Sequence, residues 1–338
     1  ETMPGGPGSG AYSDGNCAPN SCSVTSTSVK SIADDFAMFK SACPLQKFLQ
    51  PRTELEWSYY QAGPASDNDT VVFLHGTSST AAVFFYQVQA FGEKGYRAVS
   101  AQYPAFDCPD SWCKGFDLFL DALKCRTVHI VGAGLGGFLG QHFAAKYPNR
   151  VRSLALCNAF ASTGAFADRA GTLGTMISLM PTSLLRQAVL DAFPQEGYME
   201  LSAKQAIDWV GQQVHQISGD DLGSRMSLNC TPSLVSPLRL DYSQIVILES
   251  SGETMVPEEL RRELKELYRD SRLAQLKSTG DFPYLSRPEE VTLFVEVHLR
   301  GLGVSPSGQG GPVLGADAAG GAMTTAREAL LLGGRHDE

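Results

Sequence analysis

The sequence has no run of about 18 consecutive apolar residues and no excess of basic side chains. The first absence argues against a membrane-spanning helix. The second argues against a nucleic-acid partner, because 27 Lys and Arg stand against 36 Asp and Glu. The 338 residues, 43% of them hydrophobic, can still bury one large core or two small ones. The first residue is Glu and not Met, which is typical of a fragment or a processed chain, so an N-terminal targeting signal is left open.

The spacing of a metal site is also missing. The eight cysteines include the pairs Cys17/Cys22 and Cys108/Cys113, but no second Cys or His pair follows at zinc-site spacing. We therefore expect no metal ion. An even number of cysteines would suit disulfides in a secreted protein, whereas reduced thiols suit a cytosolic chain with an ample core. We favour the second interpretation.

Two segments at the ends have the composition of disordered tails. Residues 1–30 are rich in Gly, Ser, Thr, Pro and Asn, and residues 303–338 are rich in Gly and Ala. We therefore predict a single folded domain over residues 31–302.

Within that domain, apolar runs alternate with patterns of helical spacing. Thr70–Leu74 is uninterrupted, as in a strand buried on both faces. Further strands are predicted at 96–102, 127–131, 151–157, 245–248 and 272–276, and helices at 83–93, 116–124, 136–146, 257–267 and 288–299. This order predicts a mostly parallel sheet with helices on both faces.

A helical insert interrupts the alternation at about residues 161–240. Helices are predicted at 173–193, split at Pro181, and at 203–216 and 222–229. A helical cap inserted after strand 6 is the arrangement of the α/β-hydrolase fold. A doubly wound nucleotide-binding fold is the alternative.

The segment Val128–Gly137 has the form of a nucleophile elbow without a nucleophile. The elbow pattern is Gly-x-Ser-x-Gly between a buried strand and a helix, and Gly134 stands at its centre. Glycine carries no atom that attacks a carbonyl, but it adopts the positive φ of an elbow at little cost. The alternative is a dinucleotide-binding turn with the pattern Gly-x-Gly-x-x-Gly. The segment lacks the third glycine at the spacing that this pattern requires, and the next strand does not end in the Asp or Glu that would bind a ribose. We therefore expect no cofactor.

Several strings resemble the maspardin family, a group with the α/β-hydrolase fold. They lie between about residues 34 and 302 and include Trp57–Pro64, Phe84–Gln87, Gly95–Pro104, Gly136–Leu139, Leu228–Cys230 and Phe282–Leu285. The resemblance implies a cytosolic protein that associates peripherally with endosomal and trans-Golgi membranes and binds proteins without hydrolysing a substrate. It also implies a receptor cytoplasmic tail or an aldehyde-dehydrogenase-like protein as partner.

The resemblance places the triad positions at Gly134, Glu253 and Asp281. Glu253 matches the catalytic acid. We favour a purely structural interpretation, in which Glu253 is a solvated loop carboxylate before a helix N-terminus, where negative charge is stabilising. Asp281 stands in Gly280–Pro283, where active members have the His of a Gly-His-Phe-Pro turn. With an ordinary pKa near 4, Asp281 would be a poor base. Maspardins carry Ser at the elbow and Asn in this turn, so this chain departs further from catalysis.

The loop after the first parallel strand is the predicted oxyanion loop. His75, Gly76 and Thr77 belong to it, and the amide of Leu135 is its partner. We expect His75 to shape the loop and the remaining histidines to be packing or surface residues.

These observations predict a pseudo-hydrolase that acts as a protein-binding adaptor. One alternative is a sensor that binds a small molecule under the cap. Another is a residual hydrolase or lyase with a mechanism that needs no triad.

Overall fold

A computed structural model describes residues 31–66, 68–194, 199–252 and 254–306. The predicted N-terminal tail and Glu253 lie outside the described residues, and so does the predicted C-terminal tail from residue 307 onward. Within the described part, Val304 is still buried against the domain.

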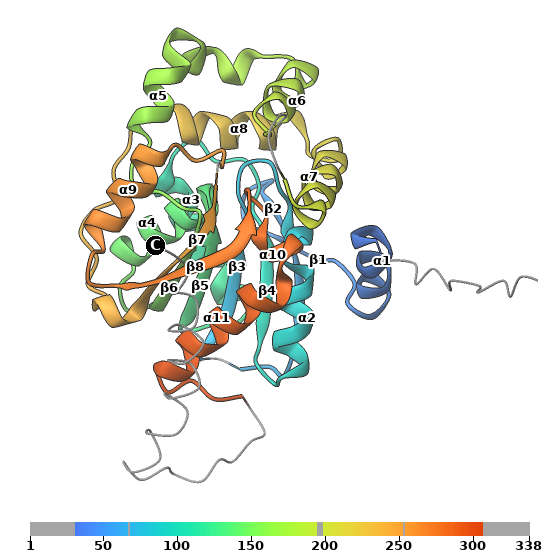
Figure 1. Cartoon of the computed structure of the whole chain (residues 1–338), viewed down its shortest axis with the longest axis vertical. Coiled ribbons are helices and arrows are strands. Elements are labelled where there is room, and N and C mark those ends of the chain that lie inside the picture. Colours follow the sequence, from blue (N-terminus) through green and yellow to red (C-terminus); the bar gives the residue numbers. More distant parts are fainter. Residues whose placement is uncertain (1–30, 67, 195–198, 253, 307–338) are drawn as a thin grey trace, which may run out of the picture. The chain divides into compact units, whose positions relative to one another are not determined.

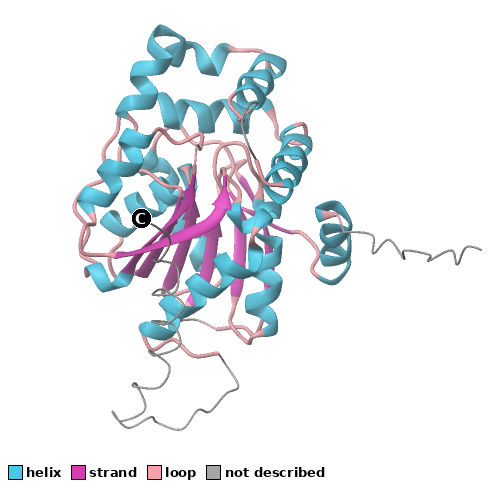
Figure 2. Ribbon diagram, in the orientation of Figure 1, coloured by secondary structure: helices cyan, strands magenta, loops and turns pink. Residues whose placement is uncertain are grey.

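The described strands form one sheet in the order β1-β2-β4-β3-β5-β6-β7-β8 (Figures 1 and 2). Strand β2 runs antiparallel to β1 and β4, and the other neighbours are parallel. The predicted mostly parallel sheet is therefore confirmed. The strands are β1 Gln46–Leu49, β2 Glu56–Ala62, β3 Thr70–Leu74, β4 Ala98–Gln102, β5 Val128–Ala133, β6 Val151–Cys157, β7 Ile245–Ser251 and β8 Arg272–Thr279.

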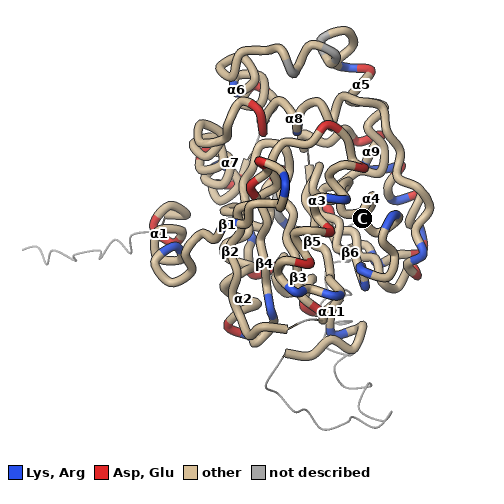
Figure 3. The backbone as a smooth tube through the Cα atoms, turned by 180° about the vertical axis from the view of Figure 1, so that it is seen from behind, with Lys and Arg blue, Asp and Glu red and all other residues tan. Residues whose placement is uncertain are grey.

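Helices cover both faces of the sheet because its central strands are apolar on both sides. Val71 and Phe73 of β3 pack in one core with α1, α2 and α11. Val72 and Leu74 of the same strand point the other way and pack with α3, α4 and α9. Strands β3, β4 and β5 contain no Asp, Glu, Lys or Arg, and Figure 3 shows charged residues gathered mainly on helices and loops. These helices are α1 Ile32–Ala42, α2 Phe85–Glu93, α3 Pro109–Ala122, α4 Leu135–Lys146, α9 Glu258–Leu267 and α11 Pro288–Gly301.

The predicted cap is confirmed between β6 and β7, beyond the carboxyl ends of the strands (Figure 1). Its elements are α5 Gly164–Ala170, the 3-10 helix η2 Gly171–Leu179, α6 Thr182–Asp191, α7 Leu201–Val214 and α8 Gly219–Cys230. Pro181 divides η2 from α6, as predicted, because proline cannot continue the helical hydrogen bonds. None of the helices in the described ranges is both long and apolar enough to cross a bilayer.

Some boundaries and elements differ from the sequence prediction. The helix predicted at Phe116 begins seven residues earlier, at Pro109, where Cys108 N–H donates a 3.3 Å hydrogen bond to Ser111 Oγ. Proline is favourable at the first position of a helix, so Pro109 could have been used to predict this helix start from the sequence. The prediction also omitted α1, β1, β2, α5, η3 (Tyr242–Gln244) and α10 (Pro283–Ser286), and it merged the 3-10 helix η1 (Ala81–Phe84) into the helix predicted at 83–93.

Candidate functional site

The elbow turn is present, and Gly134 occupies its apex. Strand β5 ends at Ala133, Gly134 has φ 49° and ψ −119°, and α4 begins at Leu135. The Gly134 N–H donates to Cys157 O at 3.1 Å, and Gly137 N–H donates to Gly134 O at 3.0 Å. The turn is thus held by backbone bonds that do not depend on a side chain at its apex.

The glycines around the apex are required by close packing, whereas Gly134 is not. A Cβ at Gly132 would lie 2.4 Å from Gly137 Cα, and one at Gly136 would lie 2.2 Å from Leu74 O. A Cβ at Gly134 would meet Gly76 Cα as its nearest neighbour, at 3.9 Å. The scaffold therefore keeps room for a side chain at the nucleophile position.

A pocket of about 290 Å³ lies between this turn, the loop after β3 and the cap. The body contributes Gly134 and Leu135 from the elbow and Gly76 and Thr77 from the predicted oxyanion loop. The remaining lining is mostly apolar: Ser78, Ser79, Ala133, Asn158, Phe160, Phe166, Ala188, Val189, Ala192, Met226, Asn229, Cys230, Met255, Val256, Asp281, Phe282 and Tyr284. The structure therefore brings Gly134, Asp281, Gly76, Thr77 and Leu135 together.

Asp281 is the carboxylate of this pocket. It is only 7% exposed, and its Oδ1 accepts a 2.7 Å hydrogen bond from Met255 N–H. Its Oδ2 is buried without a hydrogen-bond partner among the residues that the structure describes. Burial raises the pKa of Asp281 to about 7, although the Met255 bond and the charge of Arg261 oppose the rise. The assumption of an ordinary pKa near 4 was therefore wrong, because the sequence did not show this burial.

Asn158 is a site residue that sequence reasoning missed. It follows β6 with φ 42°, and its Nδ2 donates to Ser250 Oγ at 3.0 Å and Gly280 O at 3.3 Å. Its Oδ1 accepts from Ser250 N–H at 3.0 Å. Asn158 thereby ties the end of β7 to the turn that carries Asp281. An Asn directly after a buried strand was the available signal, since Asn tolerates positive φ better than most residues.

His75 lies behind the oxyanion loop and not on the pocket wall. Its Nδ1 is 2.8 Å from Gly76 O, and its ring stacks on Tyr103 with centroids 4.4 Å apart. Complete burial and the nearby charge of Arg225 hold the pKa of His75 well below its usual value. The ring therefore shapes the loop as a neutral group.

The cap helix α8 is fastened to this loop by two polar side chains that were not singled out from the sequence. The buried Arg225 donates to Ser79 O at 2.8 Å and stacks its guanidinium over Tyr103 at 5.1 Å. Asn229 Nδ2 donates to Thr77 Oγ1 at 2.7 Å. The cap and the oxyanion loop are thus parts of one hydrogen-bonded unit.

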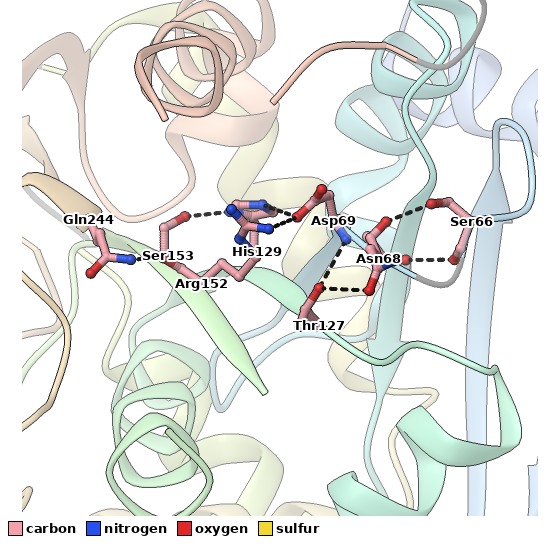
Figure 4. A network of polar contacts seen from close by, with 9 residues as sticks. Ser66, Asn68, Asp69, Thr127, His129, Arg152, Ser153 and Gln244 are labelled. Atoms are coloured by element: carbon pink, nitrogen blue, oxygen red, sulfur yellow. Dashed lines mark hydrogen bonds and ion pairs between the residues drawn. The ribbon is translucent and has the colours of Figure 1, made fainter. Parts of the chain in front are cut away.

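A Ser-His-Asp arrangement does occur, but at the amino edge of the sheet, away from the pocket (Figure 4). His129 Nδ1 lies 2.7 Å from Ser153 Oγ, and its Nε2 lies 3.4 Å from Asp69 Oδ1. Asp69 also pairs with Arg152 at 3.2 Å. Ser153 and His129 are each 1% exposed, so a substrate cannot reach them. This set is a polar network, buried at His129 and Ser153 and partly exposed at Asp69, that joins β5 and β6 to the start of β3.

The fold, the elbow turn and the capped pocket define an α/β-hydrolase-fold protein, and residues 71–292 match the alpha/beta hydrolase family. A solved thermophilic esterase from Thermogutta terrifontis superposes with a TM-score of 0.61 over 77% of this chain and 99% of its own, at 14% identity. The maspardin of Danio rerio is 37% identical over 80% of this chain and 86% of its own length. The maspardin of Mus musculus is 38% identical over 79% and 87%. The chain therefore belongs to the maspardin family.

Proposed function

We propose that this chain is a non-catalytic maspardin-family protein that acts as a protein-binding adaptor in endosomal or Golgi trafficking or in receptor regulation. The observation that carries the proposal is the pair Gly134 and Asp281, which both line the pocket and which the family resemblance assigns to two triad positions. An acyl-transfer triad needs an attacking atom and an imidazole that activates it. Gly134 has no such atom, and no described histidine lines the pocket.

The other hydroxyl and thiol groups of the pocket do not replace the elbow residue. Thr77, Ser78 and Ser79 come from the loop after β3 and have no imidazole beside them in the described lining. Burial raises the pKa of Cys230, which keeps its thiol protonated, and a protonated thiol is a poor nucleophile. Cys157, the last residue of β6, is buried and is not part of the described lining, and burial raises its pKa to about 12.

A protein partner is supported by apolar side chains that the cap leaves exposed. Met176 and Leu179 are 53% and 78% exposed, and they lie three positions apart in the 3-10 helix η2. Residues three apart share one face of such a helix, so the two side chains present one apolar surface. The partners proposed from the family resemblance are a receptor cytoplasmic tail and an aldehyde-dehydrogenase-like protein, met in the cytoplasm and at endosomal or trans-Golgi membranes.

An esterase assay tests the absence of catalysis. The wild-type protein should give no turnover of p-nitrophenyl butyrate above a buffer control. The variant Gly134→Ser/Asp281→His tests whether the scaffold supports hydrolysis once both groups are restored. Saturable turnover by the wild type that disappears in Asp281→Asn would overturn the proposal, since it would show water activation by this carboxyl.

Affinity purification from the native organism tests the adaptor role. Wild-type protein should capture specific proteins that a Met176→Ser/Leu179→Ser variant loses. Leu293→Ser is the matched control, because Leu293 is also exposed but lies on α11, far along the chain from the cap. Capture of nothing beyond the tag-only control would contradict the adaptor role.

The pocket favours a second function, a small-molecule sensor. Its lining is largely apolar, and such clefts bind ligands without a nucleophile. A ligand there would touch both α8 and the oxyanion loop, which Asn229 and Arg225 already connect. Occupancy can therefore alter how the cap sits on the body.

A further inference from the structure

We propose that the pocket under the cap binds a small amphiphilic amine, whose ammonium donates a hydrogen bond to Asp281 Oδ2 while its apolar part fills the space below the cap. This inference rests on the proposed sensor function and specifies the class of ligand that the sensor would bind.

The first step is the unpartnered carboxylate oxygen. Asp281 Oδ1 is already bonded to Met255 N–H, while Oδ2 has no partner among the described residues and belongs to a group that lines the pocket. A buried carboxylate without a partner is costly, so a ligand that supplies a donor gains the energy of a charge-assisted hydrogen bond. A ligand that supplies another acceptor gains nothing from the ionised group.

The second step is the charge around that oxygen. Arg261 of α9 is the cation that acts on Asp281, yet burial outweighs it and raises the pKa of the carboxyl. Among the described residues, Cys157 of β6 and Tyr284 of α10 interact electrostatically with Asp281, and Cys230 of α8 lines the same pocket. Burial raises the pKa of each, so all three are neutral at pH 7. Among the described residues, Arg261 acts on Asp281 through its charge alone and makes no hydrogen bond or ion pair with it, so Oδ2 can still accept a hydrogen bond from an ammonium.

A second acceptor lies on the cap side of the pocket. Asn229 uses its Nδ2 on Thr77, and its Oδ1 is buried with no hydrogen-bond partner in the described part of the chain. A primary ammonium has three donors, so it can serve more than one acceptor. Its apolar part would contact Phe160, Val189 and Met226.

The volume limits the size of the ligand. A cavity of about 290 Å³ holds on the order of ten non-hydrogen atoms, if each takes roughly the 30 Å³ of a water molecule. The eight-carbon compounds 1-octylamine, 1-octanol and octanoate fit this limit and differ only in their head groups.

Calorimetric titration of the full chain with these three compounds tests the proposal. At pH 8, 1-octylamine should bind at least tenfold more tightly than 1-octanol or octanoate. Its affinity should rise between pH 6 and pH 8, because the amine stays charged while Asp281 ionises. Asp281→Asn should lose the preference for the amine. Asp270→Asn, which removes an exposed carboxylate, should retain it.

The outcomes separate the ligand class from the sensor function. If 1-octanol or octanoate binds as tightly as 1-octylamine or more tightly, the amine is not the ligand class, but the pocket still binds ligands. If none of the three compounds binds, both the amine proposal and the sensor function are contradicted. The pH dependence of the wild type gives a result even if Asp281→Asn fails to fold, and an affinity that is flat from pH 6 to pH 8 contradicts a contact with this carboxyl.

Discussion

Asp281 Oδ1 accepts a 2.7 Å hydrogen bond from the backbone N–H of Met255, so the turn after β8 is joined to the loop after β7. The bond occupies one carboxylate oxygen and leaves Oδ2 without a partner among the described residues. Burial raises the pKa of Asp281 to about 7, because the single bond from Met255 and the charge of Arg261 compensate the buried charge only in part. Asp281 is therefore a buried acid whose pKa lies near neutral pH.

The first prediction concerns the pH dependence of stability. The folded pKa of Asp281, about 7, lies above its ordinary value of 3.8, so between these values the folded state holds a proton that the unfolded state has lost. Stability falls as pH rises through this window, and the cost is complete above pH 7. Asp281→Asn should therefore raise the free energy of unfolding at pH 8 by up to about 4 kcal/mol, because each pKa unit corresponds to about 1.36 kcal/mol.

Urea unfolding of wild type and Asp281→Asn at pH 4, 6 and 8 measures this effect. The variant keeps an acceptor for Met255 N–H, so the difference should shrink toward zero near pH 4. A constant difference across the pH range would show that Asp281 does not titrate as described.

The second prediction separates the glycines of the elbow. Gly134→Ser should fold and lose roughly 1 kcal/mol, because positive φ strains a residue with a Cβ while the space is open. Gly136→Ala should fail to give soluble folded protein, since its Cβ would meet Leu74 O at 2.2 Å. Gly211→Ala in α7, where a Cβ has an ordinary 3.6 Å contact, is the control. Thermal unfolding ranks the three, and equal losses at positions 134 and 136 would refute the distinction.

The third prediction concerns the fastening of the cap. Arg225→Met should lower the free energy of unfolding by roughly 3 kcal/mol, because it removes charge-assisted bonds to buried carbonyls of Ser79 and Tyr103. Arg225→Lys should recover only part of the loss, since an ammonium lacks the planar fork. Arg169→Met, which breaks an exposed ion pair with Glu259, should cost less than about 1 kcal/mol. Denaturant titration measures the free energy of unfolding of each variant. Similar losses for the Arg225 and Arg169 variants would contradict the role of Arg225 in holding the cap to the loop.

The fourth prediction concerns acid sensitivity. Burial lowers the pKa values of His142 and His298 to about 4, below their ordinary 6.5. The folded state therefore resists a proton that the unfolded state accepts, so stability is full above pH 6.5 and declines as pH falls toward 4. His142→Gln should reduce the decline between pH 6.5 and pH 4, whatever its effect at pH 7. His215→Gln, an exposed site, should leave the decline unchanged. An unaltered decline in His142→Gln would refute the role of this ring.

The fold could be predicted in most of its central elements. Continuous apolar runs such as Thr70–Leu74 indicated buried parallel strands, and Pro181 marked the break in the cap. Strands β1 and β2 were missed because they are half-exposed, with mixed burial that leaves little periodicity. Helix α5 has no side chain that is fully buried, so it too carried no clear apolar pattern.

The sequence named several residues that the structure brings together, but it did not show their environment. Gly134, Gly76, Thr77, Leu135 and Asp281 do line one pocket. Asn158, Arg225 and Asn229 were not assigned to it, because each acts through partners that are distant in sequence. Arg225, for example, is 146 residues from Ser79, whose carbonyl it binds.

The sequence by itself determined that the elbow has no attacking atom, because Gly134 is a matter of composition and no packing can supply a side chain. It also determined the alternation of apolar strands and helices from which the sheet follows. Only the tertiary structure decided the character of Asp281, since burial and hydrogen bonding depend on which loops meet. It likewise decided that α8 is fastened to the oxyanion loop and that a pocket remains below the cap, because these features join segments that lie far apart along the chain.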